Sequence, residues 1–209
     1  MEYMAGCYRQ REGSGSLLLQ HYICGGVPVF LGCVCGGDDP GAGMAGGIFT
    51  GRLLGEFRSF RLGRAVKRPE KYLEKMEEAV YRHRESSFLR DGFYAVGILC
   101  IGEVFLSFSQ DSAKTILCNT GFGRPVLSEI GAEDGTGLHF WRGTVESGIG
   151  ILLAPDGFCK NIPMEDMAHC LDVKAIRDSG QAQKRVRELG CMAERRGGRN
   201  MSALLLEVR

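Results

Sequence analysis

A single carboxylate stands at the end of an apolar run in the second half of the chain. Ile151 to Ala154 are apolar and lead directly into Pro155, Asp156 and Gly157. An unbroken apolar run that ends in turn residues is typical of a strand buried on both faces. Asp156 therefore lies where a core strand reaches the surface, and a carboxylate there can bind a metal ion or act as an acid or base. The sequence also allows a structural role, in which Asp156 makes the turn or caps a following helix.

Thiols are the second group that can do chemistry. The nine cysteines are odd in number and scattered, which is typical of reduced thiols in the cytoplasm. Cys33 and Cys35 share one face of a predicted strand, but no second pair follows at zinc spacing. Arg9 and Arg11 interrupt any apolar stretch near the N-terminus, so a signal peptide is not predicted. We therefore expect a cytoplasmic protein without a zinc site.

Length and charge favour one domain over residues 1–209, with 44% hydrophobic residues and a formal net charge of +1. This balance predicts neither nucleic acid nor a membrane as a partner. No segment approaches the roughly 18 consecutive apolar residues of a membrane span. The charge is nevertheless uneven, and we interpret one group of cations as a solvated helix face rather than a phosphate or partner surface: Arg52, Arg58, Arg61, Arg64, Lys67 and Arg68.

Apolar spacing predicts the elements that position these residues. Strands are predicted over residues 17–24 and 27–35, a glycine-rich loop over 36–47, and helices over 48–66 and 69–86. Strand runs alternating with helix pairs favour antiparallel sheets covered by helices, which is an α+β fold. The later elements are strands at 93–101, 103–109, 115–118, 138–141, 150–154 and 202–208, and helices at 163–176 and 181–195.

Five short segments, in order along the chain, resemble motifs of the metal-dependent type-2C (PPM) serine/threonine protein phosphatases. The family's strand-Ser-Asp-Gly segment is similar to ILLAPDGF, and its final Asp-Asn-Ile/Met-Thr/Ser and terminal strand are similar to RGGRNMSALLLEV. Its Gly-Asp-Ser-Arg segment resembles GEVFLSFSQDSAKTIL. Its Val-x-Asp-Gly-x-Gly-Gly…Ala-Gly segment resembles FLGCVCGG with Ala42-Gly43, and its Arg-x-x-Asn-x-Asp resembles REGSGS. The likeness covers most of the chain.

The resemblance implies a four-layer α-β-β-α sandwich of two antiparallel sheets flanked by helix pairs. It also implies a site at one end of the sandwich, where carboxylates hold two Mn²⁺ or Mg²⁺ ions that bridge a hydroxide. That hydroxide attacks phosphoserine or phosphothreonine, and hard dications of this kind prefer oxygen ligands. Asp156 follows Asp111 by only 45 positions (156 minus 111), fewer than is usual in the family, so the domain is predicted to be shortened between residues 118 and 150.

Most of the family's acidic positions are lost when its site is carried over residue by residue. The early Asp falls on Ser16, the first Asp-Gly on Cys35 and Gly36, and the last Asp on Arg199. The second Asp-Gly keeps its acid as Asp156. A thiolate is a soft ligand that suits Mg²⁺ or Mn²⁺ poorly, and a guanidinium repels an adjacent cation. These positions predict a degenerate metal site.

Four further residues keep alternatives open. Arg11 falls on the family's phosphate-contacting Arg, and Asp111 falls on a position that in the family can assist a weaker third metal. Asp38 or Asp39 lies three or four residues beyond Cys35 and can supply a ligand from the loop.

The preferred hypothesis is a protein-phosphatase-like domain that has lost its two-metal centre and acts as a pseudophosphatase or a phosphoprotein-binding regulatory module. It predicts no cofactor, an ion pair between Arg199 and Asp156 in place of the metal ions, and a phosphorylated protein or a kinase as partner. The alternative is an active, divergent Mn²⁺- or Mg²⁺-dependent phosphoserine/phosphothreonine phosphatase that uses Asp156, Asp111 and Asp38 or Asp39. A third class is an unrelated structural or redox protein.

Overall fold

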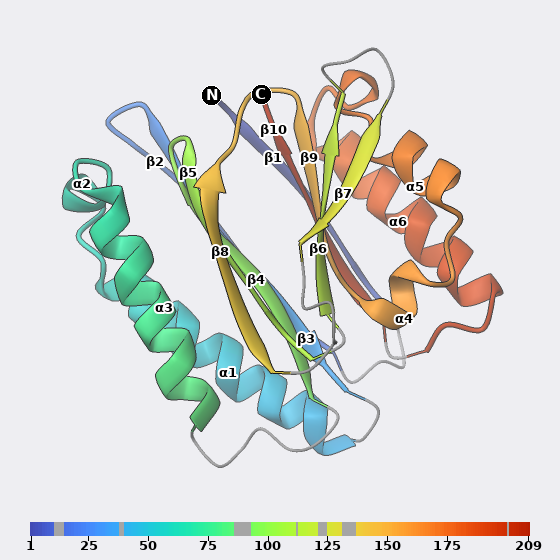
Figure 1. Ribbon diagram of the computed structural model, residues 1–209, viewed down its shortest axis with the longest axis horizontal. Coiled ribbons are helices and arrows are strands. Elements are labelled where there is room, and N and C mark those ends of the chain that lie inside the picture. Colours follow the sequence, from blue (N-terminus) through green and yellow to red (C-terminus); the bar gives the residue numbers. More distant parts are fainter. Residues whose placement is uncertain are drawn as a thin grey trace.

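The computed structural model describes residues 1–10, 15–37, 40–85, 93–111, 113–120, 125–130, 137–199 and 201–209. Two five-stranded antiparallel sheets lie face to face, and each carries helices on its outer face (Figure 1). The prediction of an α+β fold with a four-layer α-β-β-α sandwich is therefore confirmed. Each strand places alternate side chains on two faces, and each apolar face needs a cover, which the opposite sheet and the helices provide.

The first sheet brings the two terminal strands together in the order β1-β10-β9-β6-β7, with all described pairs antiparallel. Strand β10 is buried on both faces. Its Leu204 and Leu206 join the cluster between the sheets, whereas Leu205 joins the cluster beneath the helices. The strands are β1 Tyr3–Arg9, β6 Ala113–Asn119, β7 Val126–Ile130, β9 Ile149–Pro155 and β10 Ser202–Val208.

The second sheet has the order β2-β3-β4-β5-β8 and is also antiparallel. A buried polar contact joins the two sheets, since Ser107 Oγ of β5 lies 2.8 Å from Thr115 Oγ1 of β6. The Tyr3 hydroxyl of β1 also donates to the Gly102 carbonyl in the turn after β4, and an apolar cluster fills the space between the sheets. The strands are β2 Ser16–Cys24, β3 Val27–Gly36, β4 Tyr94–Ile101, β5 Val104–Gln110 and β8 Leu138–Thr144.

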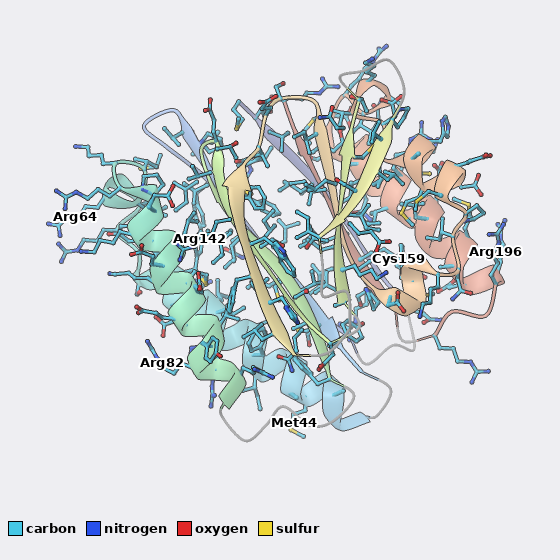
Figure 2. All side chains as sticks on the ribbon, in the orientation of Figure 1. Met44, Arg64, Arg82, Arg142, Cys159 and Arg196 are labelled. Carbon is cyan, nitrogen blue, oxygen red and sulfur yellow. The ribbon has the colours of Figure 1, made fainter. Side chains whose placement is uncertain are left out.

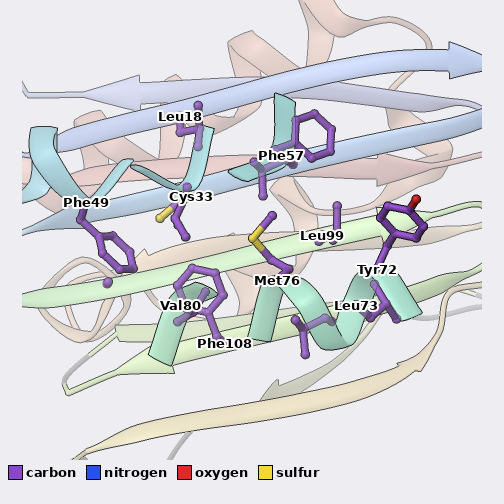
Figure 3. Packing of buried hydrophobic residues seen from close by; sticks show 14 of the residues in the cluster. Leu18, Cys33, Phe49, Phe57, Tyr72, Leu73, Met76, Val80, Leu99 and Phe108 are labelled. Atoms are coloured by element: carbon purple, nitrogen blue, oxygen red, sulfur yellow. The ribbon is translucent and has the colours of Figure 1, made fainter. Parts of the chain in front are cut away.

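Helices cover the outer face of each sheet. Figure 3 shows Met76 and Val80 of α3 packed with Leu99 and Phe108 of the second sheet. None of the described helices is both long and apolar enough to cross a membrane. The helices on the second sheet are α1 Pro40–Ser59, α2 Leu62–Ala65 and α3 Pro69–Glu85. Those on the first sheet are α4 Asp156–Cys159, α5 Met164–Cys170 and α6 Ser179–Arg195, with a 3-10 turn at Val173–Ala175.

The glycine-rich segment is largely helical, so the prediction of a loop over residues 36–47 is wrong for most of its length. Helix α1 begins at Pro40, a residue that suits the first helical turn. The glycines that follow allow the helix to approach the sheet closely. A Cβ on Gly46 would lie 3.1 Å from Ser16 Oγ and 3.3 Å from Cys35 Sγ. Gly46 therefore serves the packing of a helix on strands.

Other element boundaries also differ from the predictions. The helix predicted over 48–66 ends at Ser59 and is followed by the separate α2, and the helix predicted over 163–176 is α5 and the 3-10 turn. Strands β1 and β7 are not predicted. Gly6 interrupts the apolar pattern of β1 because α6 packs on it, and a Cβ there would lie 2.5 Å from the Ala182 backbone. The shortening between residues 118 and 150 stays a prediction.

Candidate functional site at one end of the sandwich

The strand ends that carry the predicted site residues meet at one end of the sandwich, at the bottom of Figure 1. In the second sheet, Ser16 at the start of β2 pairs with Cys35 near the end of β3. In the first sheet, Ala113 at the start of β6 pairs with Pro155 at the end of β9. The chain passes from one sheet to the other at this end, because Asp111 follows β5 directly. The topology therefore gathers the predicted positions where the resemblance implies a site.

Asp156 is the first residue of α4, and its carboxylate binds two lysines. Its Oδ1 lies 3.2 Å from Lys114 Nζ, and its Oδ2 forms an ion pair with Lys160 Nζ at the end of the same helical turn. The side chain is only 14% exposed, and a carboxylate withdrawn from water needs such partners. The N-cap of α4 is Pro155, so Asp156 occupies the first helical position and not the cap. The lysines, and not a capping role, hold this carboxylate.

Lys114 is shared between two carboxylates. It lies on β6, and its Nζ also donates to Glu129 Oε2 of β7 at 2.9 Å. The hydrogen bond to Glu129, reinforced by Asp156, raises the pKa of Lys114 against the opposing effect of partial burial. The lysine is therefore a cation at neutral pH. Its side chain is 29% exposed, whereas that of Lys160 is 74% exposed, so Lys114 is the better held of the two cations.

The predicted ion pair between Arg199 and Asp156 is wrong. Arg199 is exposed, and among the described residues the ion-pair partners of Asp156 are the two lysines. The pairing of β6 with β9 places Lys114 opposite Ala154, two residues before Asp156. A cation does neutralise this carboxylate, but strand pairing and helix spacing select lysine instead of Arg199.

Ser16 and Cys35 point toward α1, away from the interface between the sheets. Ser16 Oγ donates to the Gly43 carbonyl at 3.3 Å, and Cys35 Sγ donates to the Gly46 carbonyl at 3.5 Å. Cys35 is fully buried and belongs to the apolar cluster beneath α1 and α3. Both side chains thus serve the packing of α1 on the second sheet, whereas Asp156 lies against the first sheet.

Small residues and hydroxyl groups occupy the space between the sheets at this end. Gly36 faces Tyr94, and a Cβ there would lie 2.8 Å from the Tyr94 hydroxyl. Gly15 packs against Ser202, which is fully buried and whose hydroxyl has no hydrogen-bond partner among the described residues. Hard dications favour carboxylates, so these neutral groups are poor replacements for a ligand set.

Asp111 serves the turn between β5 and β6. Its φ of 55° lies in the left-handed region, which few residues other than glycine adopt. Its Oδ1 accepts a hydrogen bond from Gly137 N at 3.4 Å, and its Oδ2 accepts one from Gln110 Nε2 at 3.3 Å. Its own N–H donates to the Gly137 carbonyl at 3.0 Å. Aspartate commonly supports a turn in this way.

The described residues do not fit a two-metal centre. Across the described ranges, no group of three or more His, Cys, Asp and Glu side chains is placed to hold a metal ion. Asp156 binds lysines, and the other positions predicted from the resemblance, Ser16, Cys35 and Arg199, carry a hydroxyl, a thiol and an exposed guanidinium. Arg11, Asp38 and Asp39 lie outside the described residues, so the predictions made for them stay predictions.

The two lysines are the residues that sequence reasoning missed. Lys160 had a usable signal, because it follows Asp156 by four residues and the pair meets on one helical turn. Lys114 had none, because its approach depends on which strand lies beside β9. The sequence alone therefore could not decide whether the carboxylate at this strand end binds a metal ion or a lysine side chain.

The sequence matches no protein-family model and no curated protein. The structure, by contrast, is similar over its full length to solved bacterial phosphatases. PppA, a key regulatory component of the T6SS in Pseudomonas aeruginosa, is 16% identical with a TM-score of 0.69, and the match covers 100% of this chain and 99% of that one. The serine/threonine phosphatase PstP/Ppp of Mycobacterium tuberculosis is 13% identical with a TM-score of 0.69, covering 100% and 98%.

A third similar structure is the PPM Ser-Thr phosphatase MsPP from Mycobacterium smegmatis, in complex with cacodylate. It is 13% identical with a TM-score of 0.66, and the match covers 100% of this chain and 99% of that one. Identities this low establish the fold and leave the activity open. The predicted resemblance is confirmed at that level, because the chain has the fold of the PPM-type serine/threonine phosphatases.

Proposed function

We propose that this chain, with the fold of the PPM-type serine/threonine phosphatases, is a pseudophosphatase that regulates other proteins by binding them. The observation that carries the proposal is the state of Asp156. This residue is the acid retained from the family's carboxylate set, and Lys114 and Lys160 bind both of its oxygens. In working relatives that place is expected to hold divalent ions, and the catalytic domain of PstP has been solved with two manganese ions.

Electrostatics supports this proposal. Two unit charges about 4 Å apart interact by roughly 4 kcal/mol at an effective dielectric constant near 20, and a dication doubles that figure. A metal ion at Asp156 would have to displace Lys160, which can swing into water, and also Lys114, which Glu129 holds in place. Binding there would break the ion pairs of both lysines and bring like charges together, and Glu129 is already engaged by Lys114.

A regulatory role is supported by the similar structures. PppA is described as a regulatory component, and another similar structure belongs to the bacterial stressosome, a system that controls secondary messenger signalling. We infer that the partner here is a phosphorylated protein or a kinase in the cytoplasm. Arg11, outside the described residues, and Arg199, which is exposed, are the proposed phosphate contacts. Titration of a phosphoserine peptide into the wild type and an Arg11→Ala/Arg199→Ala variant tests this contact, which is excluded if both bind equally.

The direct test of the proposal is hydrolysis of an aryl phosphate by the full chain with Mn²⁺ or Mg²⁺. The comparison uses Asp156→Ala, with Asp166→Ala as the matched control because Asp166 is an exposed acid on α5. We expect no metal-dependent turnover that Asp156→Ala removes. Calorimetric titration of the same three proteins with Mn²⁺ is expected to show no site that depends on Asp156.

The opposite result would identify an active phosphatase. If metal-dependent turnover is present in the wild type and in Asp166→Ala but lost in Asp156→Ala, the pseudophosphatase proposal is wrong. Loss of the same turnover in Asp38→Ala, Asp39→Ala or Asp111→Ala would then identify the remaining acids. In that case the chain is a metal-dependent phosphomonoester hydrolase of the serine/threonine type.

A further inference from the structure

A pocket rich in cations lies where α2 meets α3, far from Asp156. Helix α1, which has 20 residues and is therefore about 30 Å long, runs from the candidate-site end to this end. Figure 2 shows Arg64 at the outer edge of α2, on the opposite side of the molecule from Cys159 of α4. We call this feature the α2–α3 pocket. It encloses about 390 Å³ and is lined by Arg64, Lys67, Arg68, Lys71, Tyr72 and Lys75.

Local backbone structure gathers the cations. Lys67 N donates to the Arg64 carbonyl at 3.2 Å, and Arg68 N donates to the same carbonyl at 3.1 Å, so the chain turns tightly after α2. Ala65 is fully buried and anchors this turn on the apolar layer. Lys71 and Lys75 follow at helical spacing on α3, which places them on one side of that helix.

Tyr72 gives the pocket a fixed wall. Its side chain is buried, and its ring packs edge-on against Phe60 with the ring centroids 4.9 Å apart. Lys75 Nζ lies 5.1 Å from the centre of the Tyr72 ring, within the range of a cation–π contact. A ring fixed in the core thus holds one ammonium group at the pocket.

The pocket cations are unpaired among the described residues. No described carboxylate forms an ion pair with any of the five. Elsewhere on α3, Arg82 pairs with Glu56 of α1 at 3.1 Å, and Glu77 pairs with Arg142 of β8 at 2.6 Å. Exposed acids such as Glu70 and Glu74 lie on α3 itself but do not pair with these lysines. Like charges gathered in one place repel, and an anion relieves that repulsion.

We propose that the α2–α3 pocket binds a small soluble ligand that carries two or more phosphate groups. Ammonium and guanidinium groups are the side chains that bind phosphate oxygens most strongly, and several negative charges are needed to balance five cations. The volume falls within the range of small-molecule sites. The N-terminus of α3, a 17-residue helix, adds a partial positive charge beside the pocket. The concave shape favours a compact ligand over a membrane surface.

The test is calorimetric titration of the full chain with inorganic tripolyphosphate at physiological salt. The variant Lys67→Gln/Lys71→Gln/Lys75→Gln removes three pocket cations. The matched control Lys174→Gln/Arg177→Gln/Lys184→Gln removes three exposed cations elsewhere and changes the net charge equally. We expect the pocket variant to bind roughly 30-fold more weakly than the wild type, at about threefold per exposed ion pair. The control is expected to stay within about threefold of the wild type.

Three outcomes would overturn the proposal. Equal losses in the two triple variants would mean that binding follows net charge, without a pocket. Absence of tripolyphosphate binding at millimolar concentration would exclude the ligand class. Binding to vesicles of phosphatidylserine and phosphatidylcholine, lost in the pocket variant and without tripolyphosphate binding, would assign these cations to a membrane surface instead.

Discussion

The two ends of the molecule use the same kind of side chain for opposite purposes. At Asp156, the ammonium groups of two lysines form ion pairs with carboxylates of the same chain. In the α2–α3 pocket, five cations lie around an open volume without a described carboxylate partner. A count of charges cannot distinguish these regions. The difference lies in pairing, and each prediction below changes one side of this contrast.

The largest effect on the free energy of unfolding is expected from Glu207, a buried carboxylate without the ion-pair partners that Asp156 has among the described residues. Glu207 is fully buried on β10, and neither oxygen has a hydrogen-bond partner among the described residues. Burial raises the pKa of Glu207 to about 8, and Arg209 only partly offsets this. The folded state therefore keeps a proton that the unfolded state loses above about pH 4.5, so the free energy of unfolding falls as pH rises from that value to about 8.

The measurement is urea unfolding at pH 5, 7 and 8.5 for the wild type and for Glu207→Gln. At about 1.4 kcal/mol per pKa unit, Glu207 is expected to lower the wild-type stability by a few kcal/mol across this range. Glu207→Gln should flatten the profile and exceed the wild type at pH 8.5. Parallel profiles for the two proteins would show that the carboxyl group is solvated or paired.

The second-largest effect on stability is expected at Lys114, beside Asp156. Lys114→Met leaves Asp156 and Glu129 without their shared cation, so we expect a loss of about 2 kcal/mol in the free energy of unfolding, less than for a fully buried pair. Lys174→Met, which removes an exposed lysine outside any described ion pair, should change stability by less than about 0.5 kcal/mol. Thermal and urea unfolding at pH 7 measure both.

The same lysines allow a positive test of the cation argument. In Lys114→Met/Lys160→Met the repulsion toward a metal ion at Asp156 is removed, so Mn²⁺ affinity measured by calorimetry should rise about tenfold or more. Adding Asp156→Ala to this double variant should abolish the gain. Unchanged Mn²⁺ affinity in the double variant would mean that the lysines are not what keeps metal ions away.

A third, smaller effect on stability comes from packing, and it compares a glycine near each end of the molecule. Gly46 lies against Ser16 and Cys35, where a Cβ would be 3.1 Å from the nearest atom, so Gly46→Ala should cost about 1–2 kcal/mol. Gly63 of α2 has open space around its Cβ position, and Gly63→Ala should stabilise the protein by about 0.5 kcal/mol. Urea unfolding of both variants checks the signs, and equal changes would remove the packing contrast.

The smallest effect compares a paired with an unpaired surface cation. Arg142→Gln removes the ion pair with Glu77 and should lower the free energy of unfolding by up to about 0.5 kcal/mol. Lys71→Gln removes one of five repelling cations and should raise it by a few tenths of a kcal/mol at low salt. Added salt should shrink both differences, and salt-independent values would show that charge is not their cause.

Local sequence patterns predicted more of the fold than of the candidate site. The strand predicted over residues 93–101 agrees closely with β4, because apolar side chains fill this stretch apart from Gly97 and every position from Tyr94 to Ile101 is buried. The start of α1 was not predicted, because Gly46 is required by its contact with Ser16 and Cys35, and a contact partner is not visible in a local stretch of sequence. Strand β1 was not predicted for the same reason, since its Gly6 is required by the contact with α6.

The sequence by itself determined the alternation of strand runs and helix pairs, and hence antiparallel sheets covered by helices, because the apolar period of each segment is a local property of the chain. It also carried the prediction that Ser16, Cys35 and Arg199 stand where the family has acids. Only the tertiary structure decided which cation reaches Asp156 and which cations stay unpaired beside Tyr72. The physical reason is that charge pairing depends on distances of a few ångströms between elements distant in sequence, and those distances are set by strand order and helix packing.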